Sequence, residues 1–120
     1  MTATVRLEFP FPPSTNTMFP TRGKARVPSP AYRAWRDEVQ LRLNRQNPAK
    51  LSGAVSVRID LVAPDRRRRD CDNYVKAPLD ALVKAGVITD DSAVRRLSIG
   101  WEEQGAPCSV LVTACERGEA

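Results

Sequence analysis

The 120-residue sequence contains no histidine, and this absence excludes several kinds of enzyme. Ser-His-Asp hydrolases, Cys-His enzymes and nucleases with a histidine base all depend on an imidazole. Zinc sites are nearly excluded as well, because most of them use histidine or closely spaced cysteines. Any acid–base chemistry must therefore come from carboxylates, lysine or water bound to a metal.

Cysteine is scarce, and long apolar runs are missing. Cys71, Cys108 and Cys115 are odd in number and lack the spacing of a metal or redox motif, so we expect small packing residues in a reduced, cytoplasmic compartment. No apolar run is long enough to cross a bilayer and no segment resembles a signal peptide, so we expect no membrane partner. The length predicts a single domain over residues 1–120.

Positive charge is in excess, with 19 lysines and arginines against 14 acidic residues and a formal net charge of +5. Such an excess favours an anionic partner such as nucleic acid. The densest basic run is Arg66, Arg67, Arg68 and Arg69, and we expect it to grip a phosphate backbone. The alternative is a solvated connector between a strand and a helix.

Hydrophobic alternation predicts four strands, over residues 4–9, 55–61, 96–101 and 109–113. Residues 104–107 predict a hairpin turn between the last two strands. One helix is expected to begin at Ser29-Pro30 and end at Asn47-Pro48, and a second to cover about residues 72–85. The resulting order is β-α-β-α-β-β. The fold class is a small α+β domain, with two helices packed on a mixed sheet of about four strands.

Residues 10–30 are expected to form a long irregular segment, because three prolines end the first strand. Loops of this length are usually either functional or disordered. Asn16, Lys24 and Arg26 of this segment are candidate DNA contacts. A flexible solvated loop explains the same composition equally well.

An acidic cluster surrounds the second predicted helix: Asp70 and Asp72 precede it, and Asp90-Asp91 follow it. Carboxylate oxygens bind hard cations such as Mg²⁺. Either Asp70 or Asp72 can instead cap the helix, although one helix has only one N-cap. Lys76 can form an ordinary surface ion pair with Asp72 four residues earlier. A basic protein with such an acidic cluster is typical of enzymes that act on nucleic-acid phosphodiesters.

Two geometric expectations concern this helix. Pro78 should produce a kink or an irregular first turn, because proline lacks an N–H. A helix over residues 72–85 is roughly 20 Å long, whereas the five residues from Gly86 to Asp91 span at most about 17 Å. Asp91 of the same chain can therefore barely reach Asp70 and Asp72. We predict a homodimer with two sites, each combining Asp70 and Asp72 of one chain with Asp91 of the other.

The spacing Asp-x-Asp-Asn-x-x-Lys-x-x-x-Asp-x-Leu-x-x-x-Gly-x-x-x-Asp-Asp over residues 70–91 resembles the RusA family of Holliday junction resolvases. The Phe-Pro-Phe-Pro-Pro-Ser-Thr-Asn segment at residues 9–16 fits the same family. The resemblance spans the whole chain and is strongest over residues 64–91.

This resemblance implies a dimeric endodeoxyribonuclease that acts in recombination and repair. Such enzymes nick four-way junction DNA symmetrically and require Mg²⁺, for which Mn²⁺ can substitute. By matching position, the metal-holding catalytic carboxylates are Asp70, Asp72 and Asp91, assisted by Lys76. Their supporting neighbours are Asn73, Asp80 and Asp90.

Two other kinds of protein remain open from the sequence. A junction-binding module without catalysis would use the aspartates as caps and surface ion pairs, and would bind DNA without metal. A different metal-dependent nuclease would act on RNA or flaps with little structural selectivity.

Overall fold

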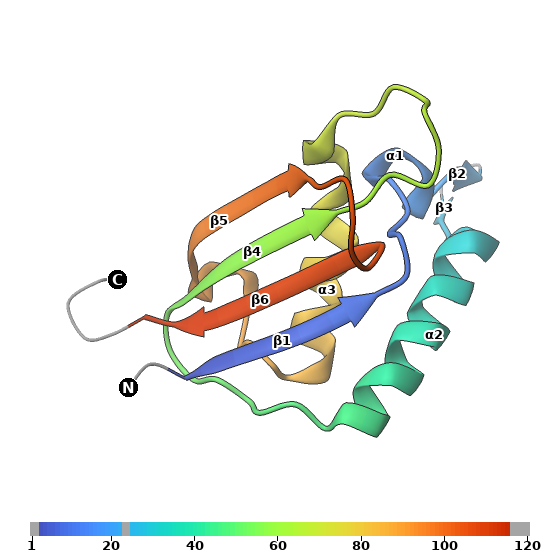
Figure 1. Cartoon of the computed structure of the whole chain (residues 1–120). Helices are drawn as coiled ribbons and strands as arrows, with labels where there is room; N and C mark the ends of the chain where they lie inside the picture. The colour runs from blue at the N-terminus through green and yellow to red at the C-terminus, as the bar shows by residue number, and fades with distance from the viewer. Residues whose placement is uncertain (1–2, 23–24, 116–120) are drawn as a thin grey trace.

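The computed structural model describes residues 3–22 and 25–115, with the backbone alone at residues 21, 22, 25 and 26 (Figure 1). The elements in chain order are β1 (Thr4–Phe9), α1 (Thr15–Met18), β2 (Thr21–Arg22), β3 (Ala25–Arg26), α2 (Pro30–Gln46), β4 (Val55–Leu61), η1 (Cys71–Tyr74), α3 (Lys76–Ala85), η2 (Asp91–Ala93), β5 (Val94–Trp101) and β6 (Cys108–Ala114), where η denotes a 3₁₀ helix. No helix in this described part of the chain is long and apolar enough to cross a membrane.

The four long strands form one mixed sheet in the order β1-β6-β4-β5. β6 pairs antiparallel with both β1 and β4, whereas β5 pairs parallel with β4. The predicted α+β class with a four-stranded mixed sheet is therefore confirmed.

The predicted hairpin between the last two strands is wrong, because β4 lies between β5 and β6. Residues 102–107 instead carry the chain across the end of β4. There, Glu102 N donates to Leu61 O (2.7 Å) and Val62 N donates to Pro107 O (3.0 Å). The physical reason is burial: β6 alternates buried and half-buried side chains, as suits a central strand, whereas most of β5 is exposed, as suits an edge.

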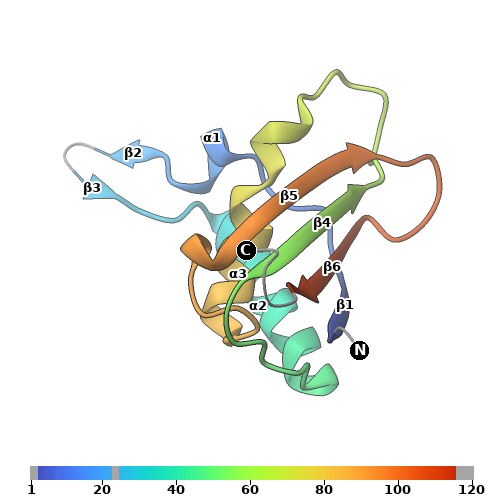
Figure 2. The ribbon, with the colours of Figure 1, turned by 90° about the vertical axis from the view of Figure 1, so that its left-hand side faces the viewer.

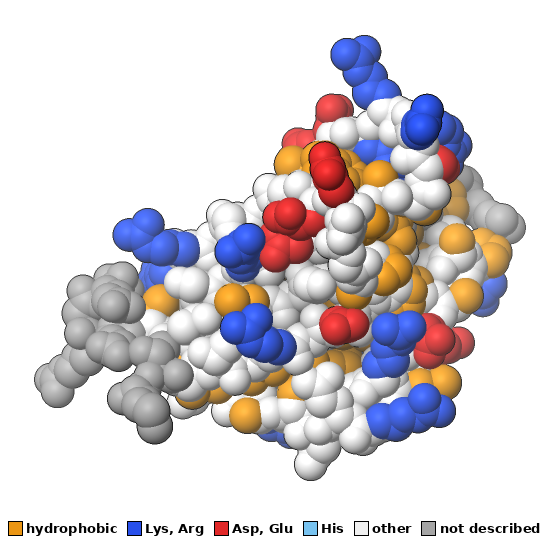
Figure 3. All heavy atoms as spheres, viewed as in Figure 1, with side chains coloured by type: hydrophobic (Ala, Val, Ile, Leu, Met, Phe, Trp, Pro, Cys, Tyr) orange, Lys and Arg blue, Asp and Glu red, His pale blue; other side chains and the backbone are white. Residues whose placement is uncertain are grey.

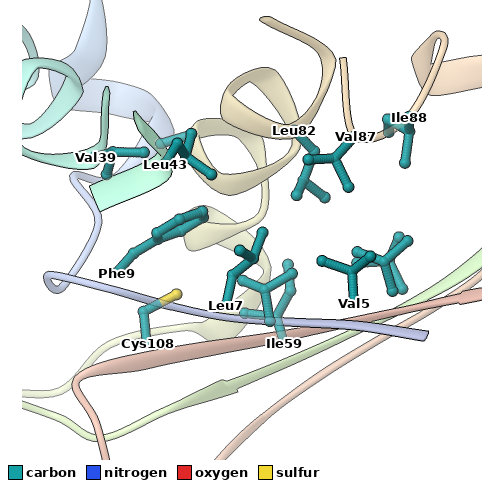
Figure 4. Close-up of a cluster of buried hydrophobic side chains, with 14 of the residues drawn as sticks. Val5, Leu7, Phe9, Val39, Leu43, Ile59, Leu82, Val87, Ile88 and Cys108 are labelled. Carbon is teal, nitrogen blue, oxygen red and sulfur yellow. The ribbon is translucent and has the colours of Figure 1, made fainter. Parts of the chain in front are cut away.

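The core lies between one face of the sheet and the helices α2 and α3 (Figures 1 and 4). Leu7 and Phe9 of β1 and Ile59 of β4 point into it, and α3 contributes Leu82. Ile59 and Leu82 are completely inaccessible to solvent. The depth of this packing fixes α3, and therefore everything attached to its N-terminal end, relative to the sheet.

The second predicted helix is divided into η1 and α3, which confirms the irregular first turn expected near Pro78. Pro78 is the third residue of α3, where a backbone N–H has no acceptor within the helix, so its missing donor breaks no helical hydrogen bond. α3 ends at Gly86, whose φ of 77° lies in the left-handed region that favours glycine.

Residues 10–30 are more ordered than expected. They contain the short helix α1 and the two-stranded ribbon β2-β3. After the ribbon the chain comes back to the end of α1, where Ser29 N donates to Met18 O (2.8 Å). α2 begins as predicted, because Ser29 Oγ accepts the N–H of Tyr32 (3.1 Å) and Pro30 is its first residue.

Candidate nuclease site

Asp72 lies on η1 and Asp70 directly precedes it, beside the end of β5, where Cys71 Sγ lies 3.9 Å from Ile99 O. Asp70 occupies the N-cap position of η1, but its carboxylate makes no capping hydrogen bond. Both carboxylates are exposed, and neither has a hydrogen bond or ion pair with the described residues. The capping role is therefore not fulfilled, and both groups are free to bind a cation from solution.

Lys76 lies beside two aspartates of its own chain, Asp80 and Asp91. Its Nζ lies 3.1 Å from Asp80 Oδ1 and 4.0 Å from Asp91 Oδ2 of the same chain. The hydrogen bond that Lys76 donates to Asp80, followed by the charges of Asp80 and Asp91, raises the pKa of Lys76 above its ordinary value. Lys76 is thus held as an ammonium group at the first turn of α3.

The last acidic pair lies at η2. Asp91 is exposed, whereas Asp90 accepts a hydrogen bond from Ser92 Oγ at 2.7 Å. This hydrogen bond, with smaller effects of backbone N–H groups, lowers the pKa of Asp90. The chain after α3 runs back beside the helix, so that Asp91 lies next to Lys76. Nevertheless, residues 3–22 and 25–115 contain no group of three or more acidic or cysteine side chains placed to hold one metal ion.

The four arginines of residues 66–69 have different environments. Arg69 forms a two-pronged ion pair with Asp65 (Nη1–Oδ1 2.7 Å, Nη2–Oδ2 3.0 Å), and its guanidinium lies 5.6 Å from the ring centre of Phe11. Its side chain is only 10% exposed. The hydrogen bonds from Arg69, together with the Arg67 N–H (2.9 Å), hold the pKa of Asp65 well below its usual value.

The remaining arginines of this run face solvent. Arg67 Nε lies 3.4 Å from Asp65 Oδ2 with an 81% exposed side chain, and Arg66 and Arg68 are exposed without an ion pair to any described residue. Figure 3 shows basic side chains gathered at the top of the molecule, over the segment between β4 and α3. Arg69 therefore fixes this segment, whereas Arg66 and Arg68 are available to an anionic partner.

The segment that follows β1 lies against η1. Thr15 Oγ1 donates to the backbone oxygen of Asn73 (3.1 Å), and the ring of Phe11 packs on Tyr74 with 5.1 Å between centroids. Asn16, Arg68 and Asp70 are among the residues lining an open hollow of about 280 Å³ beside this contact. Lys24 and the side chain of Arg26 lie outside the described residues.

Several residues of this region were not anticipated from the sequence. Asp65 and Arg69 are four residues apart, a spacing that could have suggested their ion pair. The stacking of Phe11 on Trp101 (6.2 Å, 14° between planes) had no comparable signal, because the two rings are ninety residues apart.

A small α+β domain with free carboxylates beside free arginines is typical of enzymes that act on phosphodiesters. Comparison with known proteins agrees. The family described as "Endodeoxyribonuclease RusA" matches residues 10–112. The "Crossover junction endodeoxyribonuclease RusA" of Escherichia coli (strain K12) is 42% identical over 93 residues, which cover 76% of this chain and 77% of that relative. Relatives of the same name from Shigella sonnei (strain Ss046) and Enterobacteria phage 82 are 41% and 40% identical over the same shares.

The chain therefore belongs to the RusA family, as its residue spacing indicated.

The Asp65–Arg69 pair generates a prediction about acid stability. Because the pKa of Asp65 is depressed in the folded state, its stabilising effect is fully present above the unfolded-state pKa of about 4. That effect is lost as the pH falls further. Asp65→Asn should therefore lower the free energy of unfolding at pH 7, by an amount that shrinks below pH ~4.

The measurement is urea unfolding of both proteins between pH 7 and 3. Asp37→Asn on the exposed surface of α2 is the matched control, because Asp37 makes no ion pair with the described residues. A difference between wild type and Asp65→Asn that stays constant across this range would contradict the assignment.

Proposed function

We propose that this protein is a metal-dependent endodeoxyribonuclease that resolves four-way DNA junctions. The observation that carries the proposal is the pair of exposed carboxylates of Asp70 and Asp72, which have no partner among the described residues, in a chain of the RusA family. Relatives that align with about three quarters of the chain are named crossover junction endodeoxyribonucleases. The activity would serve recombination and repair in the cytoplasm.

The side chains of the acidic cluster fit a hard divalent cation. Asp70 and Asp72 offer carboxylate oxygens for which no described residue competes, and oxygen is the ligand that Mg²⁺ and Mn²⁺ prefer. We assign Asp70, Asp72 and Asp91 as the residues that hold this ion. When bound, it neutralises charge on the reacting phosphate and acts as a Lewis acid.

The other polar residues near the proposed ligands would support them by holding charged groups in place. Asp80 fixes the ammonium group of Lys76, which then either holds the Asp91 carboxylate or meets negative charge on the phosphate. Asp90 is fixed by Ser92, and Asn73 lies directly after Asp72 on η1. Asp80, Asp90 and Asn73 are therefore proposed as supporting residues rather than ligands.

DNA would approach along the basic segment between β4 and α3. Arg66 and Arg68 are available for phosphate contacts, whereas Arg67 forms an ion pair with Asp65. Asn16 lines the same hollow as Asp70. Arg69 contributes by holding the segment in place. Lys24 and Arg26 are further proposed contacts, since the ribbon β2-β3 projects from the sheet on the same side as α1 (Figure 2).

We also propose that the active enzyme is a homodimer in which the partner's Asp91 completes each site. The support is that the described part of one chain does not gather three ligands. In addition, β5 lies at the edge of the sheet (Figure 2). Its Leu97 (44%) and Trp101 (38%) are exposed, and a second copy would cover this apolar surface. Two sites related by a two-fold axis would match the symmetry of a four-way junction.

Asp70→Asn and Asp72→Asn should each reduce junction cleavage by at least about 100-fold, because even residues that only support metal ligands cost 10–100-fold when removed. The assay compares nicking of a synthetic four-way junction and a linear duplex, with Mg²⁺ or EDTA. Asp37→Asn should cleave like wild type. Junction binding by wild type without cleavage under any divalent cation would leave a binding module. Equal cleavage of flaps or RNA would indicate a different nuclease.

Arg66→Ala and Arg68→Ala should weaken junction binding and make it less sensitive to salt. Each lost phosphate contact should reduce the slope of log K against log salt concentration by about 0.9. The measurement is junction affinity in EDTA across a salt series. Arg45→Ala at the far end of α2 is the control and should keep the wild-type slope. Unchanged slopes for both variants would show that these arginines are only solvated.

Mixing inactive variants tests the shared site. Random exchange between Asp70→Asn and Asp91→Asn subunits gives one intact site in each mixed dimer, so about a quarter of all sites should recover. Mixing Asp70→Asn with Asp72→Asn should restore nothing, because both changes lie in the same half of the site. With exchange confirmed by mass, no recovery in the first mixture would assign all ligands to one chain.

A further inference from the structure

The turn that carries Asp70 and Asp72 has little stability of its own. η1 is a four-residue 3₁₀ helix, and the 3₁₀ geometry gives poorer hydrogen bonds than an α-helix. Asn73 N donates to Asp70 O at 3.1 Å, but neither carboxylate is held by a described residue. The direction in which the two side chains point therefore depends on what the backbone of η1 packs against.

Residues 10–16 contact η1 on both sides of the aspartates. Downstream, the Thr15 hydroxyl donates to Asn73 O at 3.1 Å, and the Phe11 ring packs on Tyr74. Upstream, the same ring lies beneath the guanidinium of Arg69. The contacted residues 69, 73 and 74 thus flank Asp70 and Asp72.

This segment is itself firmly anchored. Trp35 Nε1 of α2 donates to Pro10 O at 2.9 Å, and Pro12 is fully buried. Pro10, Pro12 and Pro13 also restrict φ, which limits the number of conformations available to the chain. A rigid support of this kind can fix the geometry of a weak turn.

We infer that residues 10–16 are a positioning element, in which Thr15 and Phe11 orient η1 so that Asp70 and Asp72 present their oxygens to the same cation. This inference rests on the proposed function and deepens it. It gives Thr15 a role that requires no contact with DNA, unlike the neighbouring Asn16. Thr15 and Phe11 are positioning residues, because they act through the backbone of η1 and the side chains beside it.

Thr15→Val is the central variant, because it keeps the side-chain shape while removing the hydroxyl donor. Thr15 is exposed, so the variant should fold, and thermal unfolding checks this. Thr17→Val is the matched control: Thr17 Oγ1 donates to Ser14 O at the start of the same short helix and makes no hydrogen bond to η1 among the described residues. Thr15→Ser restores the donor, and Phe11→Leu tests the ring independently.

The readouts are Mn²⁺ affinity of the DNA-free protein by electron paramagnetic resonance, the Mg²⁺ concentration for half-maximal junction cleavage, and junction affinity in EDTA. Thr15→Val should weaken Mn²⁺ binding about 10-fold and raise the Mg²⁺ concentration for half-maximal cleavage by a similar factor. A loss of this size is at the lower end of those seen when residues that support metal ligands are changed. Its junction affinity in EDTA should equal that of wild type. Thr15→Ser and Thr17→Val should both resemble wild type, and Phe11→Leu should resemble Thr15→Val.

Three results would overturn the inference. Equal Mn²⁺ affinities for Thr15→Val and Thr17→Val would show that the contact with Asn73 does not orient the ligands. Loss of junction affinity in EDTA by Thr15→Val would make Thr15 a DNA contact instead. If wild type neither binds Mn²⁺ nor cleaves junctions, the proposed function fails together with the inference. If wild type is active and Thr15→Val has the same Mn²⁺ affinity and Mg²⁺ requirement, only the inference is rejected.

Discussion

The proposed site depends on one electrostatic constraint: Asp70 and Asp72 must stay close together and remain unneutralised by the protein's own cations. Arg69 directly precedes Asp70 in the sequence, but its charge is directed elsewhere. The two oxygens of Asp65 bind the Arg69 guanidinium at 2.7 and 3.0 Å. The packing of that guanidinium against Phe11 then limits its freedom further. One acidic residue outside the cluster thus preserves the negative charge of the cluster.

The mixed sheet brings the separate parts of the cluster to one side of the molecule. Because β5 runs parallel to β4, the segment that leaves β4 meets the end of β5, where Cys71 lies near Ile99 O. The deep packing of Leu82 holds α3 against the sheet, and the chain after Gly86 returns along the helix to η2. Lys76 can therefore contact both Asp80 and Asp91. The edge position of β5, which the hairpin prediction missed, is essential to this arrangement.

Local patterns predicted the elements well, but not the contacts between them. The alternation of β1 and β4, the Ser29-Pro30 start of α2 and the Gly86 end of α3 are short-range signals, and the structure confirms each of them. The family spacing assigned the metal-holding role to Asp70, Asp72 and Asp91, and this assignment stays a prediction. The strand order could not be read from residues 104–107, because a turn sequence does not say which strands it separates. The contact of Thr15 with Asn73 spans fifty-eight residues and leaves no local pattern.

The same electrostatics explain why the described part of a single chain, without metal, does not gather the proposed ligands. Carboxylates brought together without a cation repel one another and favour the protonated form, at a cost in free energy. Asp91 instead lies within 4.0 Å of the Lys76 ammonium, whose charge Asp80 reinforces by raising its pKa. Asp70 and Asp72 project into solvent, where water screens their repulsion. An open cluster is therefore the arrangement expected before a cation binds, and closing it requires the cation, a firmly held η1 and, in the proposed homodimer, the partner's Asp91.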